Sequence, residues 1–256
     1  MALGRLQGEH VLVTGGSRGI GAATVAKALS EGARVSILDL DEEAGRAFAQ
    51  SLGDPATLFL AQGDVRSADD IARVHDEAVA RLGPVTGLVN NAGRNSYADP
   101  VAMTEQQWDE VFSVDLKSAW LCARVVLPGM IAARKGAIVN IASVHADHTF
   151  IGYFPYAAAK SGLVGLTRSL ALEVGQHQIR VNAISPGWTE TALVAEYFSR
   201  HPPEMRQKVL AAQPMGRIAR PEEIANCIVF LLSPEASFVT GANWRVDGGL
   251  GARFAG

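Results

Sequence analysis

Short, continuously apolar segments alternate with longer amphipathic segments along nearly the whole chain. Most of the short segments lack the in-and-out alternation of a sheet with one solvated face, so we expect strands that are buried on both faces. Such strands require helices above and below a parallel sheet. The predicted strands are His10–Thr14, Arg34–Asp39, Thr57–Gln62, Gly87–Asn90, Ala137–Ala142, Arg180–Ser185 and Trp244–Val246. The predicted helices are Ile20–Glu31, Glu42–Leu52, Ala68–Leu82, Glu105–Arg134, Tyr156–Gly175 and Pro221–Leu232.

This order of elements predicts one doubly wound α/β domain over residues 1–256, with a mostly parallel seven-stranded sheet flanked by helices. Thr104 followed by Gln107 resembles a capping box, and Pro221 with two acidic residues after it suits a first helical turn. The segment Gly187–Gly216 contains three prolines, has weak sheet character and follows a strand end. We therefore expect a flap there rather than a domain boundary.

Composition excludes several classes of protein. Hydrophobic residues make up 48% of the chain and its net charge is −3, which excludes a disordered chain and argues against a nucleic-acid or anionic-membrane partner. Cys122 and Cys227 lie in apolar helical segments and suit a reducing compartment. The sequence shows no apolar stretch of the signal-peptide type and no uncharged span of 18 residues. We expect a cytoplasmic protein.

A glycine-dense segment, Thr14-Gly-Gly-Ser-Arg-Gly-Ile-Gly21, joins the first strand to the first helix. Glycines there let the backbone approach a pyrophosphate, and a helix N-terminus supplies N–H donors to phosphates; a tight strand-to-helix turn is the alternative explanation. Asp39 ends the second strand 24 residues beyond Gly15, where a carboxylate binds the hydroxyls of an adenosine ribose and repels a 2′-phosphate. Asp39 favours NAD, whereas Arg18 favours a phosphate and leaves NADP as the alternative.

Tyr156 and Lys160 lie four residues apart, so they share one face of the predicted helix. A nearby ammonium favours the phenolate and lowers the pKa of a tyrosine, which makes the phenol usable for proton transfer to an alcohol or carbonyl oxygen. Ser143 follows a strand at the edge of the sheet where ligands bind, and its hydroxyl can reach the same oxygen. The alternative for the Tyr-Lys pair alone is a solvent-facing helical pair.

With these residues the chain resembles the short-chain dehydrogenase/reductase family, and specifically its short single-domain branch with a Rossmann-like fold. The resemblance extends from about His10 to Gly249. It implies that Tyr156 is the acid/base, that Ser143 holds the substrate oxygen, and that Lys160 binds the nicotinamide ribose and lowers the pKa of the tyrosine. The shared motifs, in chain order, are the Thr14–Gly21 loop, Asp64-Val65, Asn90-Asn-Ala-Gly93, Ser143, Tyr156-x-x-x-Lys160, Arg180-Val-Asn182, Pro186-Gly187 and Val246-Asp-Gly-Gly249.

The resemblance also implies a set of cofactor contacts and an assembly. Asp64 and Val65 would flank the adenine, Asn91-Ala92-Gly93 would support the central part of the cofactor, and Pro186-Gly187 would contact the nicotinamide. Members of the family usually form homotetramers that pair the helices equivalent to Glu105–Arg134 and Tyr156–Gly175. The expected NAD-binding residues are Gly15, Ser17, Arg18, Gly19, Ile20, Gly21, Asp39, Asp64, Val65, Asn91, Ala92, Gly93, Tyr156, Lys160, Pro186, Gly187 and Thr189.

The sequence departs from the family pattern at one position. The segment Ser113-Val-Asp115-Leu-Lys117 carries Asp115 where the family usually has an asparagine that takes part in a water-linked proton relay to the lysine. A relay through the backbone carbonyl leaves the change nearly neutral. A relay through the side chain means that the carboxylate attracts Lys160 and shifts the pH profile. We therefore include Asp115 with Ser143, Tyr156 and Lys160 as a catalytic candidate.

Three stretches are expected to line the substrate pocket: Arg94–Tyr97, Val144–Tyr153 and the flap from Trp188 onward. They are rich in polar side chains, which favours a sugar, polyol or sugar acid over a steroid or long acyl chain; the alternative is that these side chains face water. His145 and His148 have no third ligand spaced with them, so no metal is expected. The candidate substrate contacts are Arg94, His145, His148, Tyr153 and Trp188.

Three functions remain open from these residues. The first is an NAD-dependent dehydrogenase that acts on a secondary hydroxyl of a small polar substrate. The second is an NADP-dependent 3-oxoacyl or ketone reductase, which Arg18 favours. The third is a non-catalytic NAD-binding regulator, which the presence of Ser143, Tyr156 and Lys160 disfavours.

Overall fold

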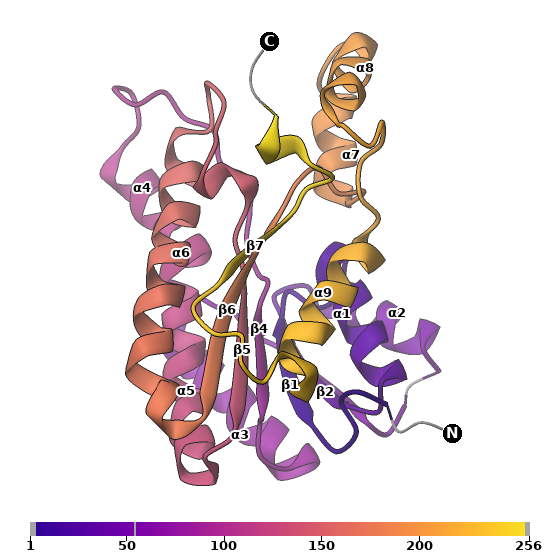
Figure 1. Cartoon of the computed structure of the whole chain (residues 1–256), viewed down its shortest axis with the longest axis vertical. Helices are drawn as coiled ribbons and strands as arrows, with labels where there is room; N and C mark the ends of the chain where they lie inside the picture. The colour runs from indigo at the N-terminus through magenta and orange to yellow at the C-terminus, as the bar shows by residue number, and fades with distance from the viewer. Residues whose placement is uncertain (1–3, 54, 254–256) are drawn as a thin grey trace.

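The computed structural model describes residues 4–53 and 55–253 (Figure 1). Within them one sheet of seven parallel strands has the order β3-β2-β1-β4-β5-β6-β7. The predicted doubly wound α/β sheet is confirmed, and all of the strand pairs are parallel. The strands are β1 His10–Thr14, β2 Arg34–Asp39, β3 Leu58–Gln62, β4 Gly87–Asn90, β5 Gly136–Ile141, β6 Ile179–Pro186 and β7 Asn243–Val246.

Helices cover both faces of this sheet. Helices α3, α5 and α6 lie on one face and α1, α2 and α9 on the other, while α7 and α8 stand beyond the carboxyl ends of the strands (Figure 1). The α-helices of the described residues are α1 Gly19–Ser30, α2 Glu42–Ser51, α3 Ala68–Leu82, α4 Glu105–Phe112, α5 Ser118–Ala133, α6 Phe154–Val174, α7 Ala192–Ser199, α8 Pro203–Ala212 and α9 Pro221–Leu232.

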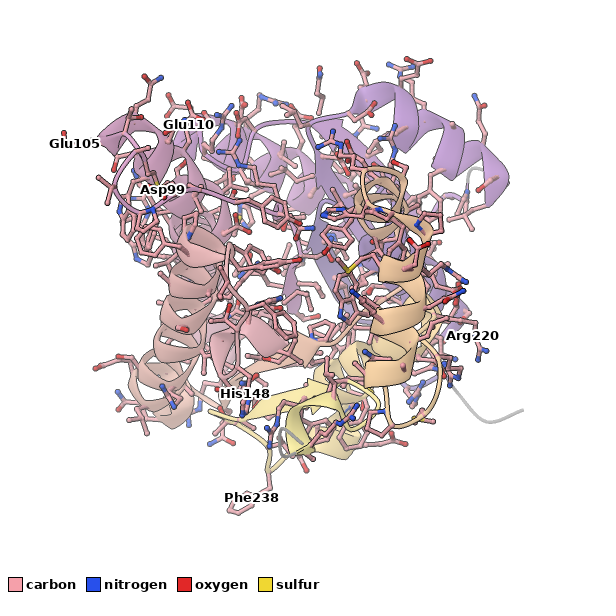
Figure 2. All side chains as sticks on the ribbon, turned by 90° about the horizontal axis from the view of Figure 1, so that it is seen from above. Asp99, Glu105, Glu110, His148, Arg220 and Phe238 are labelled. Carbon is pink, nitrogen blue, oxygen red and sulfur yellow. The ribbon has the colours of Figure 1, made fainter. Side chains whose placement is uncertain are left out.

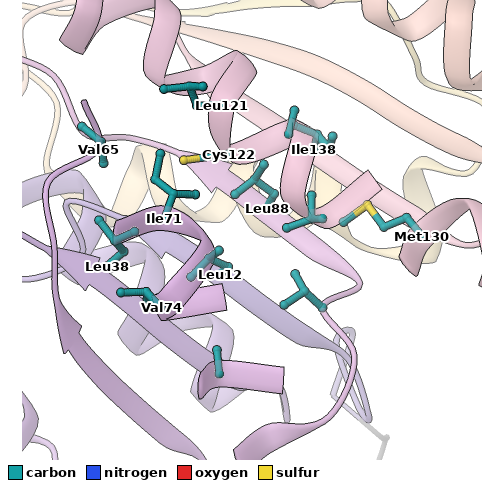
Figure 3. Close-up of a cluster of buried hydrophobic side chains, with 14 of the residues drawn as sticks. Leu12, Leu38, Val65, Ile71, Val74, Leu88, Leu121, Cys122, Met130 and Ile138 are labelled. Carbon is teal, nitrogen blue, oxygen red and sulfur yellow. The ribbon is translucent and has the colours of Figure 1, made fainter. Parts of the chain in front are cut away.

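The alternating side chains of each strand feed two separate cores, which explains why the strands are apolar throughout. Leu12 of β1 packs with Ile71 of α3 and Leu121 of α5 on one face (Figure 3). Its neighbour Val13 points to the opposite face and joins the cluster that contains Ile228 of α9. Each fully buried side chain of this kind contributes about 1.5–3 kcal/mol.

The stretch Glu105–Ala133 differs from its prediction as one continuous helix. Helix α4 starts with the predicted capping box of Thr104 and Gln107, but a π-helical turn at Ser113–Lys117 separates it from α5. By length and composition alone this stretch is apolar enough to cross a membrane. One side of α5, which includes Cys122, packs in the core beside β4 and β5, and burial raises the pKa of the Cys122 thiol to about 12.

The predicted flap, Gly187–Gly216, contains two helices that were not predicted. Thr191 caps the N-terminus of α7 by accepting a hydrogen bond from the Val194 N–H, and Pro203 is the first residue of α8. A proline in a first turn suits a helix start, because the N–H it lacks has no intrahelical partner there. Two of the three prolines that indicated an irregular segment, Pro202 and Pro203, therefore mark a helix start instead.

Buried His10 makes the stability of this fold dependent on pH. Its Nδ1 lies 2.6 Å from the Gly83 carbonyl oxygen and its Nε2 lies 2.7 Å from the Ser36 hydroxyl. Burial, aided by Arg34 and His75, lowers the pKa of His10, although the Gly83 carbonyl acts in the opposite direction.

Because the folded pKa of His10 is depressed, its stabilising contribution is complete above the unfolded value of about 6.5 and is lost as pH falls below it. We expect the free energy of unfolding in urea to fall between about pH 7.5 and pH 5 more steeply for the wild type than for His10→Leu. The comparison separates His10 from the other histidines, which both proteins share. Parallel pH curves for the two proteins would contradict this assignment.

Candidate active site

A cleft of about 480 Å³ opens at the carboxyl ends of β1, β4, β5 and β6. Figure 2 looks onto this end of the molecule, with Glu105 and Glu110 of α4 on one side and Arg220, which precedes α9, on the other. The strand order reverses between β1 and β4, and open α/β sheets bind ligands at such a point. The Thr14 hydroxyl of β1 accepts hydrogen bonds from the N–H groups of Asn91 and Ala92, which fixes the two sides of the opening.

The glycine loop has the shape that a dinucleotide phosphate needs. Gly15 and Gly19 have φ angles of +62° and +55°, which side chains rarely adopt. A Cβ on Gly21 would lie 2.0 Å from the Gly15 carbonyl oxygen, so no larger residue fits there. Because α1 begins at Gly19, its free N–H groups lie at the cleft and suit a pyrophosphate.

Two carboxylates lie beside this loop. Asp39, at the end of β2, accepts hydrogen bonds from the Ser17 N–H at 3.0 Å and from the Asp41 N–H at 3.1 Å. The Arg18 guanidinium is 2.7 Å from the Asp41 carboxylate. The charge of Arg18 is therefore already paired with a carboxylate rather than left open for a phosphate.

The three central catalytic candidates converge on the cleft. Ser143 follows β5, and Tyr156 and Lys160 project from the first turns of α6. The Lys160 Nζ lies 5.6 Å from the centroid of the Tyr156 ring and donates a hydrogen bond to the Ile141 carbonyl oxygen. The structure therefore brings Ser143, Tyr156 and Lys160 together in one cleft.

The pKa of Tyr156 differs from the expectation. Burial raises the pKa of Tyr156 above 10, although Lys160 and Ser143 act to lower it. The carboxylate of Asp115 adds to the increase. Lys160 therefore lowers the pKa of Tyr156 as predicted, but the increase caused by burial is larger, so the net change in this pKa is upward.

Asp115 lies inside the site because the π-helical turn carries it there. Its Oδ1 is 3.3 Å from the Lys160 Nζ and accepts a hydrogen bond from the Arg94 N–H at 3.2 Å. Both side chains of the ion pair are buried, at 0% and 5% exposure. Within residues 4–53 and 55–253, the Oδ2 of Asp115 has no hydrogen-bond partner. A Cβ on Gly93 would lie 2.8 Å from Oδ1, so glycine there leaves room for the carboxylate.

Most of the expected cofactor residues line the cleft, while five of them lie just outside it. The five are Ser17, Gly21, Asp39, Asp64 and Val65, at the loop and at the ends of β2 and β3. Arg66 holds the pKa of the Asp64 carboxyl below its usual value. The residues that line the cleft are Gly15, Arg18, Gly19, Ile20, Asn91, Ala92, Gly93, Tyr156, Lys160, Pro186, Gly187 and Thr189.

Four of the five candidate substrate contacts line the cleft: Arg94, His145, Tyr153 and Trp188. His148 is exposed and does not line the cleft, so the structure does not bring it together with the other four. A 3₁₀ turn at Val144–Ala146 keeps His145 at the cleft, and three residues later His148 is exposed on the surface (Figure 2). Within the described residues no group of three or more His, Cys, Asp and Glu side chains is placed to hold a metal.

Other residues of the cleft wall were not predicted individually, although the stretches that contain them were. Phe150 from the loop before α6 lines the cleft, together with flap residues at the start of α7. Apolar side chains in irregular segments have no periodicity that assigns them to a wall, so only the position of their stretch pointed to them. The flap residues are Thr191, Ala192, Leu193, Val194 and Glu196.

His145 is a neutral ring in the cleft wall. Burial lowers its pKa to about 4. Its ring stacks on Tyr153 with a centroid distance of 4.1 Å, and its Nδ1 lies 2.9 Å from the Thr149 hydroxyl. The ring also meets Tyr156 edge to face at 5.8 Å. An aromatic wall of this kind borders the Tyr156 phenol directly.

Comparison with known proteins agrees with this geometry. A family model described as enoyl-(acyl carrier protein) reductase matches residues 15–251. Cis-4-hydroxycyclohexanecarboxylate dehydrogenase of Sinomonas cyclohexanicum is 41% identical over 256 residues, covering 98% of this chain and 100% of the relative. The 3-oxoacyl-(acyl-carrier-protein) reductase FabG of Thermotoga maritima is 38% identical over 247 residues, covering 96% and 99%.

Among solved structures, levodione reductase has a TM-score of 0.90 at 33% identity and covers 97% of this chain and 100% of its own. These similarities extend over the glycine loop, the Ser143 and Tyr156 region and the flap alike. The chain therefore belongs to the short-chain dehydrogenase/reductase family, whose members transfer hydride between a nicotinamide dinucleotide and an alcohol or carbonyl carbon.

Proposed function

We propose that this protein is an NAD-dependent dehydrogenase that interconverts a secondary alcohol and its ketone. The observation that carries the proposal is the convergence of Ser143, Tyr156 and Lys160 in one cleft with the glycine loop. A protein that only binds a dinucleotide does not need a hydroxyl, a phenol and a buried ammonium at one place.

Each of these side chains has a part in alcohol oxidation. The bound dinucleotide supplies the hydride acceptor. Ser143 donates a hydrogen bond to the substrate oxygen, and the Tyr156 phenolate removes the hydroxyl proton as hydride leaves the carbon. The Lys160 ammonium, which the Ile141 carbonyl oxygen orients, lies 5.6 Å from the centroid of the Tyr156 ring and stabilises the phenolate. In the reverse direction Tyr156 returns the proton to the carbonyl oxygen.

Two carboxylates support the choice of NAD. Asp39 and Asp41 lie beside the glycine loop, at the position where the adenosine ribose would bind. A 2′-phosphate on that ribose would face both carboxylates. Arg18, the residue that favoured NADP, is paired with Asp41. The NADP-dependent reductase remains the second candidate because this exposed pair can open at little cost.

Substitution at Asp39 tests the cofactor choice. We expect Asp39→Ser to lower kcat/KM with NAD by about tenfold to a hundredfold, because charge-assisted hydrogen bonds to the ribose are lost. Activity with NADP should rise in the same variant. Asp41→Asn is the comparison variant: asparagine keeps the N-cap of α2 and leaves Asp39 in place, so activity with NAD should fall less than in Asp39→Ser, although Arg18 is also released. Preference of the wild type for NADP would contradict the proposal.

A screen of secondary alcohols and ketones for NADH formation and consumption tests the activity itself. The sequence pattern favoured a sugar, polyol or sugar acid, and these compounds belong in the screen. Three of the polar residues behind that prediction, Asp147, His148 and Glu190, lie outside the cleft lining. Tight NAD binding without turnover on any compound would support the non-catalytic regulator instead.

We also propose a homotetramer that pairs α4 and α5 with α6. Large apolar side chains are exposed on these helices, among them Trp120 at 45% and Leu172 at 85%. Exposed apolar side chains on neighbouring helices are typical of surfaces that another subunit covers. Light scattering on the purified chain measures this assembly.

A further inference from the structure

Every charged side chain in the cleft lining already has a partner of opposite charge. At the substrate end, Arg94 lies 3.4 Å from Glu110, and Glu196 lies 2.5 Å from Arg200. The remaining pairs are Arg18 with Asp41 at 2.7 Å and Lys160 with Asp115 at 3.3 Å. His145, whose pKa is about 4, adds no charge near neutral pH. The wall that meets the substrate is therefore electrically balanced.

Two threonine hydroxyls of the lining and one ring nitrogen of His145 are also engaged. Thr189 donates to the Gly187 carbonyl oxygen, and the Thr191 hydroxyl accepts from the Val194 N–H as the cap of α7. The Nδ1 of His145 is occupied by the Thr149 hydroxyl. A hydroxyl-rich substrate needs several free donors and acceptors, because each buried hydroxyl without a partner costs about 1–3 kcal/mol.

Aromatic rings form much of the rest of this wall, beside the polar side chain of Asn95. The stacked rings of His145 and Tyr153 continue to Tyr97, whose ring meets Tyr153 edge to face at 4.9 Å. Trp188, stacked on Phe198 at 5.7 Å, lines the cleft from the flap. Flat rings of this kind give a compact cyclic ligand a large contact area.

From these observations we infer that the substrate is an uncharged alcohol or ketone carried on a compact ring, with the His145–Tyr153 stack as its platform. The inference rests on the proposed dehydrogenase function. It distinguishes the substrate from sugar acids and other carboxylates, which would have to compete with Glu110 for the Arg94 guanidinium. It also distinguishes the substrate from open-chain polyols, which need several free donors and acceptors where the threonine hydroxyls are already engaged.

Three alcohols measured with NAD and the wild-type protein test the substrate class. Cis-4-methylcyclohexanol and cis-4-hydroxycyclohexanecarboxylate differ only in a methyl or a carboxylate group, and xylitol supplies the open-chain polyol. We expect kcat/KM for the methyl compound to exceed that for each of the others by at least about tenfold. A preference for the carboxylate or for xylitol would overturn the inference while leaving the dehydrogenase proposal intact. Absence of turnover on every secondary alcohol and ketone would instead remove the dehydrogenase proposal.

Two positions test the wall directly. Glu110→Gln releases Arg94 and should raise kcat/KM for the carboxylate by up to about fivefold, without a change for the methyl compound. His145→Ala should raise KM for the methyl compound by about tenfold with a smaller change in kcat, and His145→Phe should recover most of that loss because it restores a stacking ring. Recovery by His145→Gln but not by His145→Phe would show a hydrogen-bonding role and overturn the platform.

Discussion

Replacing Tyr156 with phenylalanine is expected to reduce kcat by about a thousandfold or more, the range that general acid–base catalysis supplies. The phenol is the only candidate proton acceptor among the described residues that borders both Ser143 and Lys160 in the cleft. Phenylalanine keeps the ring that contacts His145 and removes only the hydroxyl. Stopped-flow or steady-state measurement of NADH formation, with an alcohol that the wild-type protein oxidises, gives the loss in kcat.

Binding of NADH to Tyr156→Phe should remain close to that of the wild type, because the phosphate and adenosine contacts are elsewhere in the site. Tyr153→Phe provides the matched control, since it removes a phenol hydroxyl three residues away in the same wall. We expect this control to lose less than about tenfold in kcat, as it removes one contact and no proton transfer. Equal losses in the two variants would argue against the acid/base assignment.

Removing the buried partner of Lys160 should have the largest effect on stability. Asp115→Leu leaves a buried ammonium without a counter-ion, which costs about 3–5 kcal/mol in the free energy of unfolding. Asp115→Asn keeps an oxygen near the Lys160 Nζ and the Arg94 N–H, so we expect a smaller loss. Urea denaturation monitored by circular dichroism measures both values. A leucine variant as stable as the asparagine variant would show that the pair does not hold this part of the site.

The asparagine variant also separates a charge effect from a structural one. The Asp115 carboxylate raises the pKa values of both Lys160 and Tyr156. Alcohol oxidation needs the Tyr156 phenolate, so removing the negative charge should move the acid limb of the kcat profile to lower pH. An unchanged profile with a normal fold would place Asp115 among residues that only support the structure.

Sequence patterns placed the helices best where residues typical of a first turn marked the start. Ala68–Leu82 and Pro221–Leu232 have the predicted bounds, since capping and first-turn residues mark their starts. The helix predicted at Glu105–Arg134 is interrupted by a π-helical turn that packs against α6. The sequence did not predict this interruption, because a π-helical turn has no characteristic composition. Helices α7 and α8 are short, and their start signals lie among prolines that also suit a loop.

In the site, too, local sequence patterns predicted some features, whereas packing between distant elements decided others. Tyr156 and Lys160 are local partners on one helix, and Ser143 follows a strand, so spacing alone brought them to one edge of the sheet. The pairing of Lys160 with Asp115 spans two elements, and its geometry depends on the π turn and on the space at Gly93. The different fates of His145 and His148 depend on one 3₁₀ turn that carries no distinctive sequence.

The sequence by itself determined the doubly wound fold and the glycine loop and marked Tyr156 as the candidate acid/base, because each depends on residue type and short-range spacing. Only the tertiary structure decided the electrostatic character of the site. Burial raises the pKa of Tyr156 despite Lys160, and ion pairs with Asp41 and Glu110 occupy Arg18 and Arg94. Charge and burial depend on neighbours distant in the chain, which no local pattern encodes.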